Sequence, residues 1–291
     1  MNKLIYLGFI LLAWSQTFWA MKLPENHSVN GGLTIIPVDV KKQPEAYFAG
    51  KRIPVLPSEK PNQWLLVVAI PINNTDSVQY LDIKKPFKAR VPFQVSEKFY
   101  TTQSLTIKDL SKVDPTPEEK IRIDQEAEKL SKLFSQYSNT NPFESSFAAP
   151  LKGPISSLFG LKRIYNKQPR DPHSGLDIAA PEGKPVYAAS NGVVVDTGNY
   201  FLTGNIVVLD HGMGVFSLYA HLSEITVRIG DQIKQGEEVG LVGMTGRVTG
   251  PHLHWTMVVN QTLVDPLLFV PLRKIVVALP APAPKTKEPK S

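Results

Sequence analysis

Hydrophobic and polar residues alternate over short distances in the first third of this chain. Residues 31–107 contain runs rich in Val, Ile, Thr and aromatic residues, separated by polar turn segments at roughly ten-residue spacing. This pattern predicts an antiparallel β-sandwich of about seven strands, immunoglobulin-like in type, which we place at residues 21–110. The segment carries no cluster of catalytic side chains. We therefore expect a module that binds, spaces or gates.

The apolar period lengthens to three and four residues after position 115, which predicts one helix. At its N-terminus, Thr116 is the expected cap, Pro117 the first helical residue and Glu119 the capping-box partner. The expected apolar face consists of residues at three- and four-residue steps, namely Ile123, Ala127, Leu130, Phe134 and Tyr137. We expect residues 111–145, this helix and a following loop, to connect two domains.

A second β pattern, richer in glycine turns, covers residues 146–270. The expected fold class is therefore mainly β: an N-terminal sandwich, a connecting helix and a C-terminal antiparallel sheet domain. The two ends of the chain differ from these domains. Residues 1–20 have Lys3 before about eleven apolar residues, a pattern typical of a signal peptide for export, with an uncleaved anchor as the alternative. Residues 271–291 are rich in Pro and Lys and are predicted to be disordered.

The net charge of +6 is unevenly distributed along the chain. Residues 1–145 carry a net +3, residues 146–270 a net −1, and the 21-residue tail a net +4. A nucleic-acid site needs basic residues gathered on one working face, so this distribution argues against nucleic acid as a partner. The chain contains no cysteine, which excludes thiolate metal ligands and a cysteine nucleophile.

The first candidate for chemistry is the stretch "DPHSGLDIAA", in which His173 precedes Asp177 by four residues. A helical surface pair is a poor interpretation because prolines and a glycine crowd this segment. The alternative interpretation is that both side chains bind one metal ion. That interpretation requires a third ligand elsewhere in the chain.

Further histidines lie in two later motifs. "GPHLHW" places His252 and His254 two residues apart at the head of a predicted strand, so both imidazoles point to one face. "SLYAHL" contributes His221, and Tyr219 shares its face if this run is a strand. Each motif alone is more often structural than functional. Four of the six histidines nevertheless fall in these three motifs, and we assign no role to the others, His27 and His211.

These motifs carry a specific resemblance. "HSGLDIAAP", "YAHL" and "GPHLHW", in this order and with glycine-rich β runs between them, resemble the lysostaphin-type zinc endopeptidases that cut peptidoglycan peptides. The resemblance covers residues 146–270 and implies a β-sheet peptidase domain with a groove. The lead-in "ISSLFGLKRIYNKQPRDPHSG" and the preceding sandwich and helix resemble the Gram-negative, envelope-located branch of that family.

The resemblance implies a role for each motif residue. His173, Asp177 and His254 would bind Zn²⁺, and His221 and His252 would form an unliganded catalytic pair. Two imidazoles and one carboxylate also fit a hydrolytic zinc centre, which needs three protein ligands and one open position. Asn205 and Tyr219 are weaker candidates for substrate-binding positions on the groove wall.

The expected function is that of a zinc metallopeptidase that cuts peptidoglycan stem peptides or crosslinks as a D,D-endopeptidase in the periplasm or cell envelope. Carboxypeptidase trimming fits the same residues. One rival is a non-catalytic relative that binds peptidoglycan or activates another hydrolase, but such a protein would have lost ligands. A lipoyl-type carrier domain shares the β architecture and would not need the histidines. A regulatory envelope partner and the oligomeric state stay open, as does whether the sandwich gates the groove or only spaces it.

Overall fold

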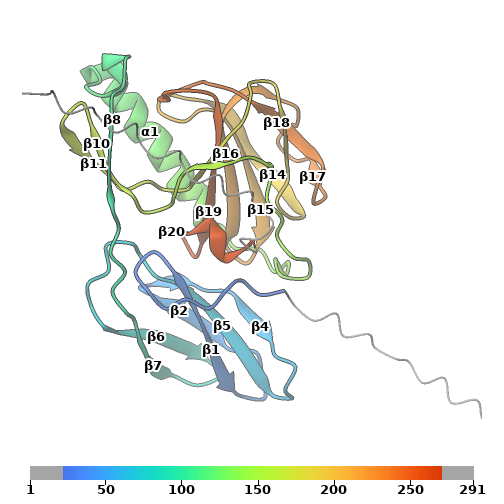
Figure 1. Ribbon diagram of the computed structural model, residues 1–291. Helices are drawn as coiled ribbons and strands as arrows, with labels where there is room; N and C mark the ends of the chain where they lie inside the picture. The colour runs from blue at the N-terminus through green and yellow to red at the C-terminus, as the bar shows by residue number, and fades with distance from the viewer. Residues whose placement is uncertain (1–21, 271–291) are drawn as a thin grey trace, which may run out of the picture.

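The computed structural model describes residues 22–270 (Figure 1). The predicted signal peptide and the Pro/Lys-rich tail lie outside the described residues. Within them the fold is mainly β with one long helix, as the hydrophobic pattern predicts. None of the described helices is long and apolar enough to cross a bilayer.

The N-terminal domain is a sandwich of two sheets, which confirms the predicted architecture (Figure 1). One sheet has the order β1-β5-β4 and the other the order β3-β2-β6-β7. Their strands are β1 (Leu33–Asp39), β2 (Glu45–Phe48), β3 (Lys51–Arg52), β4 (Val55–Pro57), β5 (Gln63–Ala69), β6 (Val78–Lys85) and β7 (Ala89–Gln94). The sandwich core lies between the sheets, where Leu66 and Val68 of β5 pack with Phe48, Leu81 and Ile83.

Strand β5 is apolar on both faces, and its second face joins the two domains. Val67 and Ala69 point away from the sandwich core and belong to the same hydrophobic cluster as Trp255 and Tyr219 of the C-terminal domain. A buried hydrogen bond of 3.0 Å from the Ala69 amide to Oδ1 of Asn260 lies at this interface. One hydrophobic cluster therefore extends across the interface between the two domains.

The run at 102–105 does not belong to the sandwich, contrary to our assignment of the β runs up to residue 107. Strand β8 (Thr102–Leu105) pairs in parallel with β10 (Lys162–Tyr165), which pairs in turn with β11 (Gln168–Arg170). The N-terminal sheets end with β7, and β8 lies beside the C-terminal domain (Figure 1). Local alternation predicted the strand correctly, but its partner lies 60 residues further along the chain.

The connecting segment contains a short 3₁₀ helix, η1 (Leu110–Lys112), and the helix α1 (Pro117–Phe134). Both hydrogen bonds of the predicted capping box at Thr116 are present. The apolar face contacts the sheet only near its end, where Leu130 and Phe134 pack against a cluster that includes Phe216. Ala127 is exposed, and Tyr137 lies beyond the helix. The predicted apolar face is thus correct for the last turns of the helix only.

The C-terminal domain is built on a ten-stranded sheet with the central order β17-β14-β15-β16-β19-β12-β9. Strands β13, β18 and β20 pair off this path. The strands are β9 (Ile155–Ser157), β12 (Leu176–Ala179), β13 (Pro185–Tyr187), β14 (Gly192–Tyr200), β15 (Gly204–Gly212), β16 (Val215–Ile225), β17 (Gln232–Ile233), β18 (Glu238–Val242), β19 (His252–Val259) and β20 (Thr262–Val264), followed by η2 (Pro266–Leu268). One face of this sheet carries the main core. The other face packs against α1 and carries the candidate site.

Candidate metal centre

Adjacent strands β12 and β19 bring two of the candidate ligands together. Asp177 and His254 are direct cross-strand partners in this antiparallel pair. Their chain neighbours Leu176 and Leu253 are fully buried in the main core, so period-two alternation turns Asp177 and His254 to the opposite face. The backbone at Gly175 lies so close to β19 that a Cβ there would be 2.4 Å from the Trp255 carbonyl oxygen, so only glycine fits at this position.

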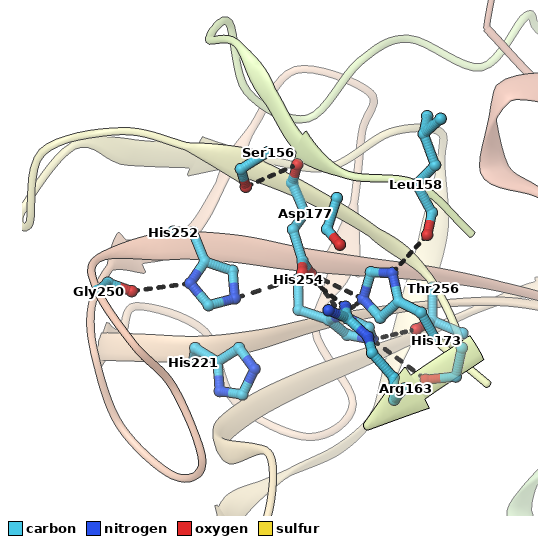
Figure 2. A network of polar contacts seen from close by, with 12 residues as sticks. Ser156, Leu158, Arg163, His173, Asp177, His221, Gly250, His252, His254 and Thr256 are labelled. Carbon is cyan, nitrogen blue, oxygen red and sulfur yellow. Dashed lines mark hydrogen bonds and ion pairs between the residues drawn. The ribbon is translucent and has the colours of Figure 1, made fainter. Parts of the chain in front are cut away.

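His173 completes a compact group of three ligand atoms (Figure 2). Its Nε2 lies 3.0 Å from Oδ1 of Asp177 and 3.0 Å from Nδ1 of His254. Nδ1 of His254 lies 2.8 Å from the same Asp177 oxygen. All three residues are buried. His173, Asp177 and His254 thus form a metal site with two nitrogen donors and one carboxylate oxygen.

The remaining nitrogen of each ligand imidazole has a fixed partner. Nδ1 of His173 donates to the Leu158 carbonyl at 2.7 Å, so its Nε2 carries the lone pair that faces the site. Nε2 of His254 lies 2.9 Å from the Thr256 hydroxyl, which can accept its proton and leave Nδ1 for the site. Such outer hydrogen bonds orient imidazole ligands and select their tautomers.

The electrostatic environment favours the protonation states that a metal ion requires. Burial raises the pKa of the Asp177 carboxyl, but contacts with the imidazoles of His173 and His254 outweigh burial and lower that pKa well below its usual range. Burial lowers the pKa of His254. At neutral pH the carboxyl is therefore ionised and the His254 imidazole is neutral, as metal binding demands.

His221 and His252 lie beside the ligands as a second pair. Their ring centroids are 4.8 Å apart, and the ring of His221 is 5.8 Å from that of His254. Nδ1 of His252 donates to the Gly250 carbonyl at 2.8 Å (Figure 2). Nδ1 of His221 donates to the Thr245 carbonyl, also at 2.8 Å. In the neutral form of each ring the lone pair therefore lies on Nε2, and Nε2 of His252 is 3.7 Å from Oδ1 of Asp177. Burial, with the neighbouring histidines, lowers the pKa of His221 to about 3, so this imidazole is neutral at physiological pH.

A β-bulge in β16 places His221 at the site. Val207 pairs with Tyr219 and Asn205 with Leu222, so Ala220 and His221 together oppose a single residue of β15. His221 has a φ of +63°, the left-handed conformation found in bulges. Regular alternation would have turned His221 into the main core.

The same bulge overturns the prediction that Tyr219 lines the groove on the face of His221. Tyr219 is fully buried in the main core, where its hydroxyl oxygen accepts from the Ala189 amide at 2.8 Å and from Ser217 Oγ at 2.9 Å. It therefore cannot contact a substrate in the groove. Period-two alternation failed here because it does not hold across a bulge.

Asn205, the other weak candidate for the groove wall, makes hydrogen bonds beside the bulge. Its side chain donates to the Leu222 carbonyl at 2.9 Å, directly after the bulge, and accepts from Asn199 at 2.8 Å. These contacts tie β15 to the bulged segment of β16. The structure therefore supports a role for Asn205 in holding the bulge that positions His221.

Sequence reasoning missed one residue at the centre. Arg163 of β10 is 5% exposed, and its Nη2 donates to Oδ2 of Asp177 at 3.3 Å (Figure 2). It lies in the segment "LFGLKRIYN" before His173. This segment contributed to the family resemblance but suggested no role for Arg163. An arginine fourteen residues before its carboxylate partner has no local signal, because the contact depends on how β10 and β12 meet.

A groove of about 770 Å³ runs over the candidate metal ligands and the pair His221 and His252. Both domains line it, since Lys51 and Ile72 of the sandwich and Arg247 of the β18–β19 loop all contribute. The guanidinium of Arg247 lies over the Tyr165 ring at 4.7 Å, and its Nη1 donates to the Lys112 carbonyl at 3.4 Å. The groove is therefore open to an extended ligand and carries a cation along its wall.

The fold and the site define a class: a β-sheet protein with a buried His-Asp-His metal centre and two further imidazoles in an open groove. Residues 171–266 match peptidase family M23, and residues 26–98 match the M23 family N-terminal domain. The crystal structure of an M23 peptidase candidate from Pseudomonas aeruginosa is 33% identical, with a TM-score of 0.70 over 84% of this chain and 95% of that one. The chain belongs to peptidase family M23.

Two curated relatives match a little under half of the chain. The peptidoglycan DD-endopeptidase ShyA of Vibrio cholerae is 42% identical over 138 residues, which are 47% of this chain and 30% of ShyA. The DD-carboxypeptidase/endopeptidase Mpg of Neisseria meningitidis is 41% identical over 128 residues, 44% of this chain and 28% of Mpg. The chain thus matches less than a third of the length of either relative.

Proposed function

We propose that this protein is a zinc-dependent peptidase that cuts peptide bonds in the stem peptides or crosslinks of peptidoglycan, with D,D-endopeptidase action. The observation that carries the proposal is the convergence of three ligand atoms from His173, Asp177 and His254 beside the unliganded pair His221 and His252. A non-catalytic relative would be expected to lack part of this set, and no member is missing.

The donor set fits zinc. Two imidazole nitrogens and one carboxylate oxygen are typical ligands of a catalytic zinc ion, which keeps a further position open. When bound, Zn²⁺ would polarise a peptide carbonyl and lower the pKa of a water molecule. His173, Asp177 and His254 would hold the ion.

The chain's own contribution to the reaction would come from His221 and His252. Each donates its Nδ1 proton to a backbone carbonyl, so each Nε2 can accept a proton from an attacking water. The proton taken up at Nε2 could then pass to the leaving amine. The two rings are close enough for both to contact one scissile peptide.

The substrate class is supported by the groove and by the relatives. ShyA and Mpg are named for action on D,D bonds, ShyA specifically in peptidoglycan. Stem peptides carry free carboxylates, and Arg247 offers a cation along the groove. A cell-envelope location follows from this substrate, and the signal-like residues 1–20 favour export to the periplasm.

The decisive experiment is digestion of purified sacculi by the mature chain, with mass analysis of the products before and after chelation. We expect crosslinked dimers to be converted to monomers, with activity lost on chelation and restored by Zn²⁺. Release of terminal D-alanine from uncrosslinked stems alone would instead show carboxypeptidase action. Binding to sacculi without any new product, from a zinc-loaded chain, would favour the non-catalytic alternative.

A further inference from the structure

The two oxygens of Asp177 have different partners. Oδ1 faces the ligand nitrogens of His173 and His254 at 3.0 and 2.8 Å. Oδ2 accepts from Nη2 of Arg163 at 3.3 Å. The guanidinium thus occupies one side of the carboxylate and leaves the other oxygen for the metal.

Arg163 is in turn held by a strand outside the peptidase segment. Its Nη1 donates to Oε1 of Gln103, and the same oxygen accepts from the Ser157 hydroxyl at 2.9 Å. Gln103 and Arg163 are direct partners in the parallel pairing of β8 with β10. Ser157 is the β9 partner of Asp177, so the four residues close a ring across β8, β9, β10 and β12.

We propose that Arg163, held by Gln103, is a positioning residue that fixes the Asp177 carboxylate for metal binding. The proposal rests on the proposed zinc-dependent function. Residues 103 and 163 both lie outside the segment 171–266 that matches the peptidase family, and residue 103 follows the matched N-terminal segment 26–98. The metal centre therefore depends on strand β8, which lies between the two matched segments.

A merely structural role makes a different prediction. If Arg163 and Asp177 only stabilise each other as a buried ion pair, loss of the arginine lowers folding stability but leaves zinc affinity unchanged in the chains that fold. A positioning role lowers zinc affinity itself. Hydrogen-bond partners of metal ligands typically contribute about 10–100-fold to metal affinity or activity.

The test uses the full mature chain with four substitutions: Arg163→Met, Gln103→Ala, Gln103→Glu and Gln168→Ala. Gln168 is the matched control, because it accepts from Arg170 in the same three-stranded sheet, away from the ligands. The readouts are the zinc dissociation constant, by competition with a chromophoric chelator, and the visible absorption spectrum of the cobalt-substituted chain. Urea unfolding of the metal-free chains reports stability separately.

We expect Arg163→Met to weaken zinc binding by about 10–100-fold. Gln103→Ala should weaken it less and alter the cobalt spectrum, because Arg163 loses its anchor. Gln103→Glu, which keeps the acceptor, and Gln168→Ala should match the wild-type chain. If Arg163→Met does not fold, Gln103→Ala decides the question.

Wild-type zinc affinity and an unchanged cobalt spectrum in folded Arg163→Met and Gln103→Ala chains would overturn the positioning role. That result would leave the proposed peptidase function intact. A wild-type chain that binds zinc but cleaves no sacculi would reject the function alone.

Discussion

At the scale of single residues, the metal centre depends on how each imidazole is held. His173, His221 and His252 each donate Nδ1 to a backbone carbonyl, and the Thr256 hydroxyl lies against Nε2 of His254. One nitrogen of every ring is therefore engaged, and the other is left for the site. The presence of a histidine is not enough for this arrangement, because an imidazole without such hydrogen bonds exchanges tautomers and rotates.

The three ligand residues should determine metal content. We expect about one zinc per chain, and His173→Ala, Asp177→Ala or His254→Ala should abolish binding or weaken it greatly, because three protein ligands are the minimum of such a site. Metal analysis after dialysis measures this, with His27→Ala as a control at an exposed histidine. Full occupancy in all three ligand variants would reject the assignment.

Loss of His221 or His252 should have the opposite effect to loss of a ligand: it should lower activity and leave zinc binding unchanged. Their alanine variants should keep zinc and lose activity by about 10²–10⁴-fold, the usual contribution of a general acid or base. Because His221 has a positive φ, His221→Asn is the better variant there, since asparagine tolerates that conformation. Zinc content and peptide turnover are measured on the same samples. Turnover near the wild-type rate would remove that histidine from the mechanism.

His211 should make folding stability depend on pH. Burial lowers its pKa to about 4, and its ring contacts the Asn191 carbonyl at 2.6 Å and Ser217 Oγ at 2.8 Å. Between pH 6.5 and 4 the unfolded chain binds this proton and the folded chain does not, so stability falls as pH falls. The loss from this residue should reach about 3 kcal/mol.

Urea unfolding of the metal-free chain at several pH values measures this effect. A His211→Gln chain should be less stable than the wild type at pH 7, and the difference should shrink as the pH approaches 4. A difference that is constant over this range would show that His211 does not titrate on unfolding.

At the scale of elements, local signals and long-range contacts decide different features. The capping box and the first helical proline predicted the start of α1 correctly, because a cap interacts within one helix. The apolar spacing predicted the helix but its buried face only in the last turns. The placement of α1 depends on polar contacts with the sheet. Lys129 pairs with Asp196 of β14 at 2.7 Å, and Arg122 donates to the Asn199 carbonyl at 2.8 Å.

Loss of the helix cap should destabilise the whole chain. Thr116→Ala removes the hydrogen bond to the Glu119 amide and should lower the free energy of unfolding by about 1 kcal/mol. Ser131→Ala, at an exposed position within the same helix, is the control and should change stability little. Equal stabilities of the two variants in urea would show that the helix N-terminus frays without consequence.

At the scale of the whole molecule, the domains are joined by a shared core. Leu33, Leu56, Val67 and Ala69 of the sandwich belong to the main cluster of the C-terminal domain. Lys51 of the sandwich lines the groove and donates to the Gln261 carbonyl at 3.1 Å. A continuous hydrophobic interface disfavours relative domain motion, which supports a fixed wall more than a moving gate.

A truncated chain that starts near Asn141 tests the two alternatives. A gate predicts faster cleavage of small peptides by the truncated chain than by the full mature chain. We expect slower cleavage, because the truncation removes Gln103 and α1 and exposes the core residues that now contact the sandwich. Turnover is compared after both chains are shown to be folded and loaded with zinc. Faster cleavage by the truncated chain would support the alternative in which the sandwich domain gates the groove.

Much of this protein is determined by local sequence. Alternation predicted the strands and turn residues separated them. The spacing of His173 and Asp177 and of His252 and His254 suggested a metal site, and the resemblance to a known family implied which of these residues are ligands. These features are local or depend on strand geometry, so a few neighbouring residues specify them.

Only the tertiary structure decided the rest. The bulge in β16 turns His221 toward the metal centre, whereas Tyr219, in the regular pairing before the bulge, stays in the core. The partner of β8 and the contact of Arg163 with Asp177 depend on strands that meet far from each other in sequence. The sequence by itself indicated most of the elements and the histidine motifs of a candidate metal site. The burial of apolar surface and the pairing of distant strands fixed which side chains reach the site.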